Sequence, residues 1–111
     1  MLSIHTHEEH THHILRIQGE IDASNSVQLN ESIRSLADNG AKSILVDGSD
    51  LEYISSAGLG VFMSYLEDFQ EQGVSLKIFA LDPKVFEVFK ILGLDQLISI
   101  FPTKEEAIQE V

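Results

Sequence analysis

Two adjacent serines, Ser55 and Ser56, occupy the point where the sequence changes from the pattern of a strand to that of a helix. A short, mainly apolar run over residues 43–46 precedes them, and apolar residues recur three and four positions apart after them, from Val61 to Phe69. Serine is a preferred N-cap, because its side-chain oxygen accepts a hydrogen bond from an amide of the first turn. A cap hydroxyl also lies at the surface, where another enzyme can esterify it. Spacing alone favours a helix cap for Ser56, with phosphorylation as the alternative, and Ser55 can share the cap.

Two glycines follow the serines closely. If Ser56 is the N-cap, Gly58 and Gly60 are the second and fourth residues of the helix. Each glycine costs a helix roughly 1 kcal/mol relative to alanine. We therefore predict that this first turn is kept slim for the close approach of another surface.

Acidic residues stand near the serines. Asp22 follows a predicted strand over residues 14–18, and Asp47, Asp50 and Glu52 fall in a segment expected to be a loop. The carboxyl ends of parallel strands share one edge of a sheet, so Asp22 and Ser56 are expected to gather there. For Asp22 the open alternatives are a cap or turn-closing role and a role in a contact surface. The loop carboxylates have the chemistry to ligate a hard cation, but solvated carboxylates are far commoner, and no metal is predicted.

Several enzyme chemistries are excluded by the pattern. The third glycine of a dinucleotide-binding loop would fall at Met63, and no Walker lysine is present. Ile54 occupies the first glycine position of a nucleophile elbow. All five histidines lie within residues 5–13, where alternation places His5 and His7 on one face of an exposed edge, with only weak metal affinity expected. We predict no catalytic residue.

Hydrophobic periodicity and turn signals predict the elements that must position the serines. Strands are expected at residues 2–6, 14–18, 43–46, 76–80 and 97–101. Helices are expected from Ser24 or Asn25 to Gly40, from Ser56 to Gly73, from Asp82 to just before Gly93, and from Thr103 to Val111. This alternation predicts an α/β fold in which an N-terminal antiparallel hairpin leads into a mainly parallel sheet.

Length and charge limit the possible partners. The 111 residues suffice for one domain with an ordinary core, and no apolar run is long enough to span a membrane. A net charge of −11 disfavours nucleic acid and anionic membranes and favours a basic protein surface. The chain has no cysteine, which excludes disulfides and thiolate chemistry. We expect a cytoplasmic protein, with a monomer as the default.

The sequence of residues 47–61, Asp-Gly-Ser-Asp-Leu-Glu-Tyr-Ile-Ser-Ser-Ala-Gly-Leu-Gly-Val, resembles the signature of STAS domains. Within that family it is most similar to the small stand-alone anti-sigma factor antagonists. The tetrapeptide over residues 19–22 resembles the family's early strand-end turn, and residues 81–94 resemble its third helix and following turn. The resemblance covers nearly the whole chain and implies a single STAS domain over residues 1–111.

The resemblance implies a partner switch. The unmodified antagonist captures an anti-sigma factor serine kinase that otherwise sequesters a sigma factor, and that kinase inactivates it by phosphorylating one serine. By position that serine is Ser56. Many family members have aspartate directly before the acceptor, whereas this chain has Ser55, which is the second candidate. The expected partner-binding residues are Asp22, Ser55, Ser56, Ala57, Gly58 and Leu59.

The same resemblance assigns ATP and magnesium to the kinase, so no cofactor is expected in this chain. A serine phosphatase would restore the active form. A phosphate placed among Asp22, Asp50 and Glu52 would repel the partner without refolding the domain. Two alternatives remain: a STAS scaffold subunit of a lipid- or anion-transport assembly, and a small enzyme that uses the acidic segment with a metal.

Overall fold

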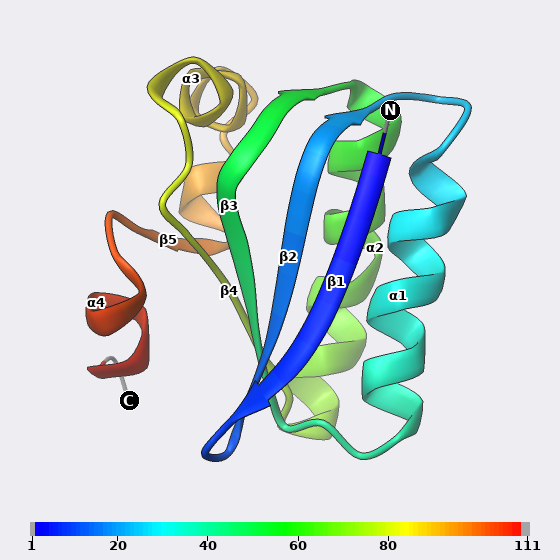
Figure 1. Cartoon of the computed structure of the whole chain (residues 1–111), viewed down its shortest axis with the longest axis vertical. Coiled ribbons are helices and arrows are strands. Elements are labelled where there is room, and N and C mark those ends of the chain that lie inside the picture. Colours follow the sequence, from blue (N-terminus) through cyan, green and yellow to red (C-terminus); the bar gives the residue numbers. More distant parts are fainter. Residues whose placement is uncertain (1, 110–111) are drawn as a thin grey trace.

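Five strands lie in one sheet in the same order as in the sequence (Figure 1). The structure is a computed structural model, and it describes residues 2–109. The strands are β1 (Leu2–Glu9), β2 (His12–Ile21), β3 (Ser43–Ile54), β4 (Ser75–Phe79) and β5 (Ser99–Phe101). The helices are α1 (Ser26–Asp38), α2 (Ser56–Gln72), α3 (Pro83–Ile91) and α4 (Lys104–Gln109), with a 3-10 turn, η1 (Leu94–Gln96), before β5.

The pairing of the strands confirms the predicted fold class. β1 pairs with β2 in antiparallel register, and β2–β3, β3–β4 and β4–β5 are all parallel. Helices α1, α2 and α3 fill the connections between the parallel strands, as a parallel crossover requires. The hairpin is longer than expected, since β1 continues to Glu9.

The prediction of an acidic loop over residues 47–52 is wrong, because these residues belong to β3. Between the Arg16–Asp47 pair and the Glu20–Tyr53 pair, β3 uses two more residues than β2, at two irregularities in the register. Such bulges twist a strand and disrupt its alternation of inward and outward side chains. Residues 48–53 therefore lack the alternation that marks a strand, although they remain part of the sheet.

Helices cover the sheet on both faces. Alternate strand residues, among them Leu15, Val46 and Ile78, face the main core that contains the apolar sides of α1, α2 and α3. Their neighbours along the strands face a smaller cluster beneath α4. This cluster consists of Ile14, Leu45, Phe79 and Ala107. Figure 1 shows α1 and α2 side by side on one side of the sheet and α4 on the other.

Most helix ends follow the predicted capping chemistry. Gly73 ends α2 in the left-handed conformation, with φ of 73°. The Asp82 carboxylate accepts a hydrogen bond of 2.8 Å from the Lys84 amide, and Pro83 is the first residue of α3. The Thr103 hydroxyl accepts from the Glu106 amide at 3.2 Å. The predicted end of the last helix at Val111 lies outside the described residues.

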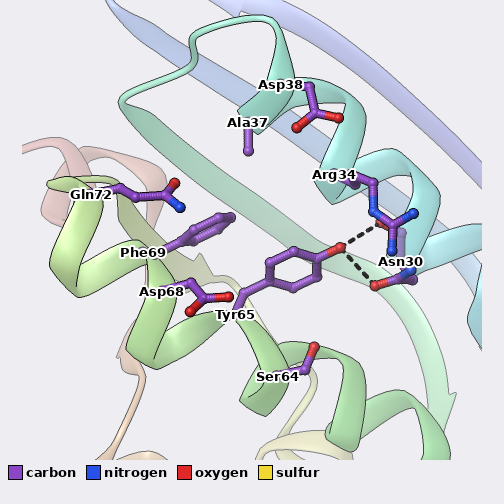
Figure 2. Close-up of a pocket in the computed structure, with 9 residues that line it drawn as sticks. All are labelled: Asn30, Arg34, Ala37, Asp38, Ser64, Tyr65, Asp68, Phe69 and Gln72. Carbon is purple, nitrogen blue, oxygen red and sulfur yellow. Dashed lines mark hydrogen bonds between the residues drawn. The ribbon is translucent and has the colours of Figure 1, made fainter.

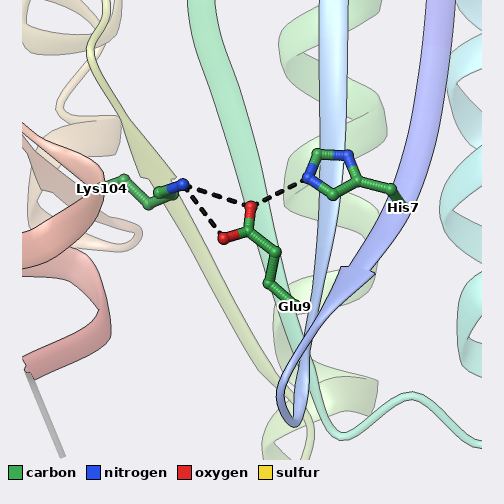
Figure 3. A network of polar contacts seen from close by, with 3 residues as sticks. All are labelled: His7, Glu9 and Lys104. Atoms are coloured by element: carbon green, nitrogen blue, oxygen red, sulfur yellow. Dashed lines mark hydrogen bonds and ion pairs between the residues drawn. The ribbon is translucent and has the colours of Figure 1, made fainter.

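Two polar contacts join elements that are distant in sequence. Figure 2 shows the Tyr65 hydroxyl of α2 lying 2.7 Å from the side-chain oxygen and 3.1 Å from the carbonyl oxygen of Asn30 on α1, beside a pocket of about 360 Å³. Figure 3 shows the Glu9 carboxylate of β1 between two side chains. The His7 Nε2 atom lies 2.9 Å from one of its oxygens, and the Nζ atom of Lys104 on α4 lies 3.1 Å from the other. Within residues 2–109, no helix is long and apolar enough to cross a membrane.

Candidate functional site

The structure separates the roles of the two serines. Ser55 is the N-cap of α2, with extended backbone, and its side-chain oxygen accepts from the Gly58 amide at 3.4 Å. Ser56 is the first residue of the helix and is exposed. The prediction that Ser56 is the cap is therefore wrong, and its hydroxyl is not needed for capping. Both hydroxyls lie at the surface end of the helix, with Ser55 half-buried.

The sheet fixes where α2 begins. Ile21 and Ile54 are partners at the carboxyl ends of β2 and β3. The next amide along β3, that of Ser55, donates a hydrogen bond of 2.9 Å to the carbonyl oxygen of Ile21. The helix therefore starts beside the end of β2, where Asp22 follows. This confirms that Asp22 and the serine pair meet at one edge of the sheet.

Asp22 organises the turn that leads into α1. One of its carboxylate oxygens accepts from the Ser24 hydroxyl at 2.6 Å, from the Ser24 amide at 2.9 Å and from the Asn25 amide at 3.2 Å. The Asn25 side chain in turn accepts from the Asp22 amide at 2.8 Å. Two hydrogen bonds from Ser24 hold the pKa of Asp22 below its usual value. The bond from the Ser24 side chain has the larger effect, and the bond from its backbone amide adds to it. Asp22 is thus a turn-closing carboxylate that stays ionised at neutral pH.

The sheet, and not an outside surface, requires a glycine at position 58. A Cβ at this position would lie 2.6 Å from the Cγ2 atom of Ile21 and 2.8 Å from the Cγ1 atom of Ile54. A Cβ at Gly60 would have no neighbour within 4 Å. The predicted reason for the two glycines is therefore wrong for Gly58, whose neighbour is internal, and Gly60 alone remains open to solvent.

Leu59 is also internal, with 2% of its surface exposed. The prediction that Gly58 and Leu59 present a contact surface is contradicted by this burial. Ala57 is half-buried and Ser56 is exposed. The candidate surface therefore narrows to Ser55, Ser56, Ala57 and the neighbouring Asp22 turn.

The acidic residues of β3 do not form a cluster. Asp47 accepts from the amide of Ser49 at 3.0 Å and from its hydroxyl at 2.8 Å. Asp50 forms an ion pair with Arg16 of β2, and the hydrogen bond from Arg16 lowers the pKa of Asp50. Within the described part of the chain, no three histidine, aspartate or glutamate side chains lie close enough together to hold a metal ion.

The start of α2 has backbone amides without acceptors in the helix. The first helical hydrogen bond runs from the Leu59 amide to the Ser55 carbonyl at 3.0 Å. Of the earlier amides, that of Gly58 is capped by the Ser55 side chain, and those of Ser56 and Ala57 have no acceptor within the helix. These amides and the helix dipole favour a negative group. Ser56 is exposed at this position, with the Asp22 turn alongside. Ser56 is therefore exposed at the positive end of the helix dipole.

Sequence reasoning missed two features of this region. The Arg16–Asp50 pair joins residues far apart in sequence, and no periodic pattern marks it. The contact of Gly58 with Ile21 depends on how α2 meets the sheet. The cap at Ser55 was named as an alternative, because two serines stand in place of one, and the end of β3 selects it.

Comparison with known proteins identifies the family. The model of the STAS domain matches residues 3–107. The anti-sigma-B factor antagonist of Bacillus subtilis is 35% identical over 95 residues, which is 86% of each chain. The anti-sigma-B factor antagonist of Listeria monocytogenes is 30% identical over 100 residues, covering 89% of this chain and 88% of that protein. The chain belongs to the STAS domain family.

Solved structures agree on the fold. An anti-sigma factor antagonist from Mycobacterium paratuberculosis superposes with a TM-score of 0.90 at 20% identity, over 100% of this chain and 94% of its own. The anti-sigma factor antagonist SpoIIAA in its unphosphorylated form gives a TM-score of 0.79 at 22% identity, over 96% of this chain and 93% of its own. SpoIIAA of Bacillus has also been solved in a phosphorylated form, with a TM-score of 0.71 at 21% identity over 96% of both chains.

Proposed function

We propose that this protein is an anti-sigma factor antagonist whose unphosphorylated form binds an anti-sigma factor with serine kinase activity and so releases a sigma factor. Ser56 is the residue that the kinase phosphorylates. The observation that carries the proposal is the exposure of Ser56 at the first helical position, directly after the capping Ser55. Two relatives at 30–35% identity that are named anti-sigma-B factor antagonists support the regulatory role.

Phosphorylation acts by changing charge at the docking surface. A phosphoryl group adds about 1.5 to 2 negative charges at neutral pH. At Ser56 it stands beside the Asp22 turn, whose carboxylate has a lowered pKa and is itself negative. A partner surface that fits a neutral hydroxyl next to one carboxylate then meets repulsion and added bulk. The free amides of the first turn accommodate the phosphate, so α2 stays folded while the partner dissociates.

The protein itself is a regulator and not an enzyme in this proposal. The kinase supplies ATP and magnesium, and a serine phosphatase returns the antagonist to its binding form. The cycle belongs in the cytoplasm, because the sigma factor acts there on RNA polymerase. Asp22, Ser56 and Ala57 form the centre of the surface that the kinase contacts.

The test is to incubate the protein with the anti-sigma factor and ATP and to locate the phosphate by mass spectrometry. We expect one phosphate on Ser56 and none on Ser56→Ala, while Ser55→Ala is the matched control and is still modified. Modification of Ser55 alone would move the site and keep the switch. A chain that neither binds nor is modified by the kinase, and that co-purifies with membrane transport proteins, would support the scaffold alternative instead.

A further inference from the structure

A groove of about 530 Å³ runs along α2 on the side towards β4 and the start of β5. Its apolar lining includes two side chains that are unusually exposed, with Met63 at 46% and Leu97 at 59%. Leu66 and Phe69 of α2 line its inner wall. Exposed apolar side chains gathered around one groove mark a binding surface more often than scattered ones do.

One residue of the groove, Met63, lies on the same face of α2 as Ser56. Ser56, Gly60, Met63 and Glu67 are spaced four, three and four residues apart, which places them on one stripe of α2. All four are exposed. Met63 lies about 10 Å along the helix from Ser56, at 1.5 Å per residue. A partner that covers Ser56 and follows the helix therefore reaches the groove.

The charged residue among those that line the groove is acidic. It is Glu67, whereas Asp68 lines the pocket between α1 and α2. Residues 56–72 contain no lysine or arginine. In a chain of net charge −11, this surface selects a cationic occupant by charge complementarity. A second copy of the chain would bring like charges together.

We propose that this groove is the second half of the partner-binding surface, and that it takes an apolar side chain from a basic segment of the anti-sigma factor. The inference rests on the proposed function and adds to it. Ser56 acts as the part of the interface that phosphorylation switches, and the Met63–Leu97 groove supplies affinity that does not depend on the modification. Apolar anchors of this kind carry most of the affinity in many interfaces.

The first test measures binding of the unphosphorylated protein to its anti-sigma factor by calorimetry. Met63→Gln and Leu97→Ser each remove apolar surface at an exposed position, and we expect each to weaken binding about tenfold. Glu67→Lys should weaken it as well and reduce its salt dependence. Ile91→Ser is the control, because Ile91 is 73% exposed but does not line the groove, and it should bind like the wild type. Thermal unfolding of each variant checks that the fold is kept.

The second test uses the kinase reaction. Because the groove lies away from Ser56, Met63→Gln should raise KM for phosphorylation and leave kcat unchanged. A purely structural effect on the start of α2 would lower kcat instead, and would overturn the assignment.

The outcomes separate the two proposals. If the wild type binds and Ser56→Asp does not, while the groove variants bind as tightly as Ile91→Ser, the switch stands and the groove proposal is wrong. If the wild type neither binds nor is phosphorylated, both fail. If the groove variants abolish self-association of the isolated protein in sedimentation runs, a second copy occupies the groove, and the proposal is overturned.

Discussion

The amide of Ser55 donates a hydrogen bond of 2.9 Å to the carbonyl oxygen of Ile21, and this contact joins the start of α2 to the end of β2. It explains why the two serines differ. The residue that follows the last strand pair is held by the sheet and caps the helix, and the next residue is free at the surface. The relationship also places the Asp22 turn beside Ser56.

The capping serine and the exposed serine should respond differently to removal of the hydroxyl. Ser55→Ala loses the bond to the Gly58 amide and should reduce the free energy of unfolding by about 0.5–1 kcal/mol, at the low end for an N-cap because the contact is long at 3.4 Å. Ser56→Ala should change it by less than about 0.5 kcal/mol, as expected for an exposed position. Urea unfolding of both variants measures the difference, and equal losses would contradict the assignment of the cap.

The two glycines of α2 should have opposite effects on stability when replaced by alanine. Gly58→Ala places a methyl group 2.6 Å from Ile21 and should cost about 1–3 kcal/mol through overpacking. Gly60→Ala meets no atom within 4 Å and should raise the free energy of unfolding by up to about 1 kcal/mol, because alanine favours the helix.

Thermal unfolding of the two alanine variants provides the comparison. Gly58→Ala should also slow phosphorylation of Ser56, since the start of α2 must shift away from the sheet. A Gly58→Ala protein as stable as the wild type would show that the sheet does not press on this turn.

The order of the elements was predictable because each helix has an apolar stripe and clear end signals. Gly73, Asp82 and Pro83 mark ends that depend only on local backbone chemistry. The hairpin and the parallel sheet follow from the order of the elements. The candidate site at the carboxyl ends of β2 and β3 was predictable for the same reason.

The remaining features depend on contacts between distant residues. Two bulges in β3 remove the alternation that marks a strand, so the sequence around Asp50 and Glu52 predicts a loop where the structure has a strand. Serine caps a helix equally well at either position, and only the pairing of Ile21 with Ile54 selects Ser55. The burial of Leu59 follows from the same placement of α2.

The link between α1 and α2 predicts a moderate loss of stability when it is removed. Tyr65→Phe deletes the hydroxyl that lies 2.7 Å from the Asn30 side-chain oxygen, and it should cost about 0.5–1.5 kcal/mol. Asn30→Ala should cost less, because the hydroxyl can still donate to the Asn30 backbone carbonyl, which lies 3.1 Å away. In the double variant the loss should equal that of Tyr65→Phe alone, and additive losses in urea unfolding would show that the two side chains act independently.

Glu9 predicts how acid acts on the contact between β1 and α4. Hydrogen bonds from two side chains lower the pKa of Glu9 below its ordinary value of 4.5. The bond from His7 has the larger effect, and the bond from Lys104 adds to it. A carboxyl with a lower pKa in the folded state stabilises that state fully above the unfolded value, and the contribution is lost as pH falls through the folded pKa. The stability difference between wild type and Glu9→Gln should therefore be largest above pH 4.5 and should shrink in acid.

The control is Glu8→Gln, which removes the same charge outside this contact. Chemical unfolding of all three proteins is measured from about pH 2 to 7, roughly the range over which carboxylates titrate. A Glu9→Gln protein whose stability runs parallel to that of the wild type across this range would show that the contact with His7 and Lys104 does not hold α4 to the hairpin.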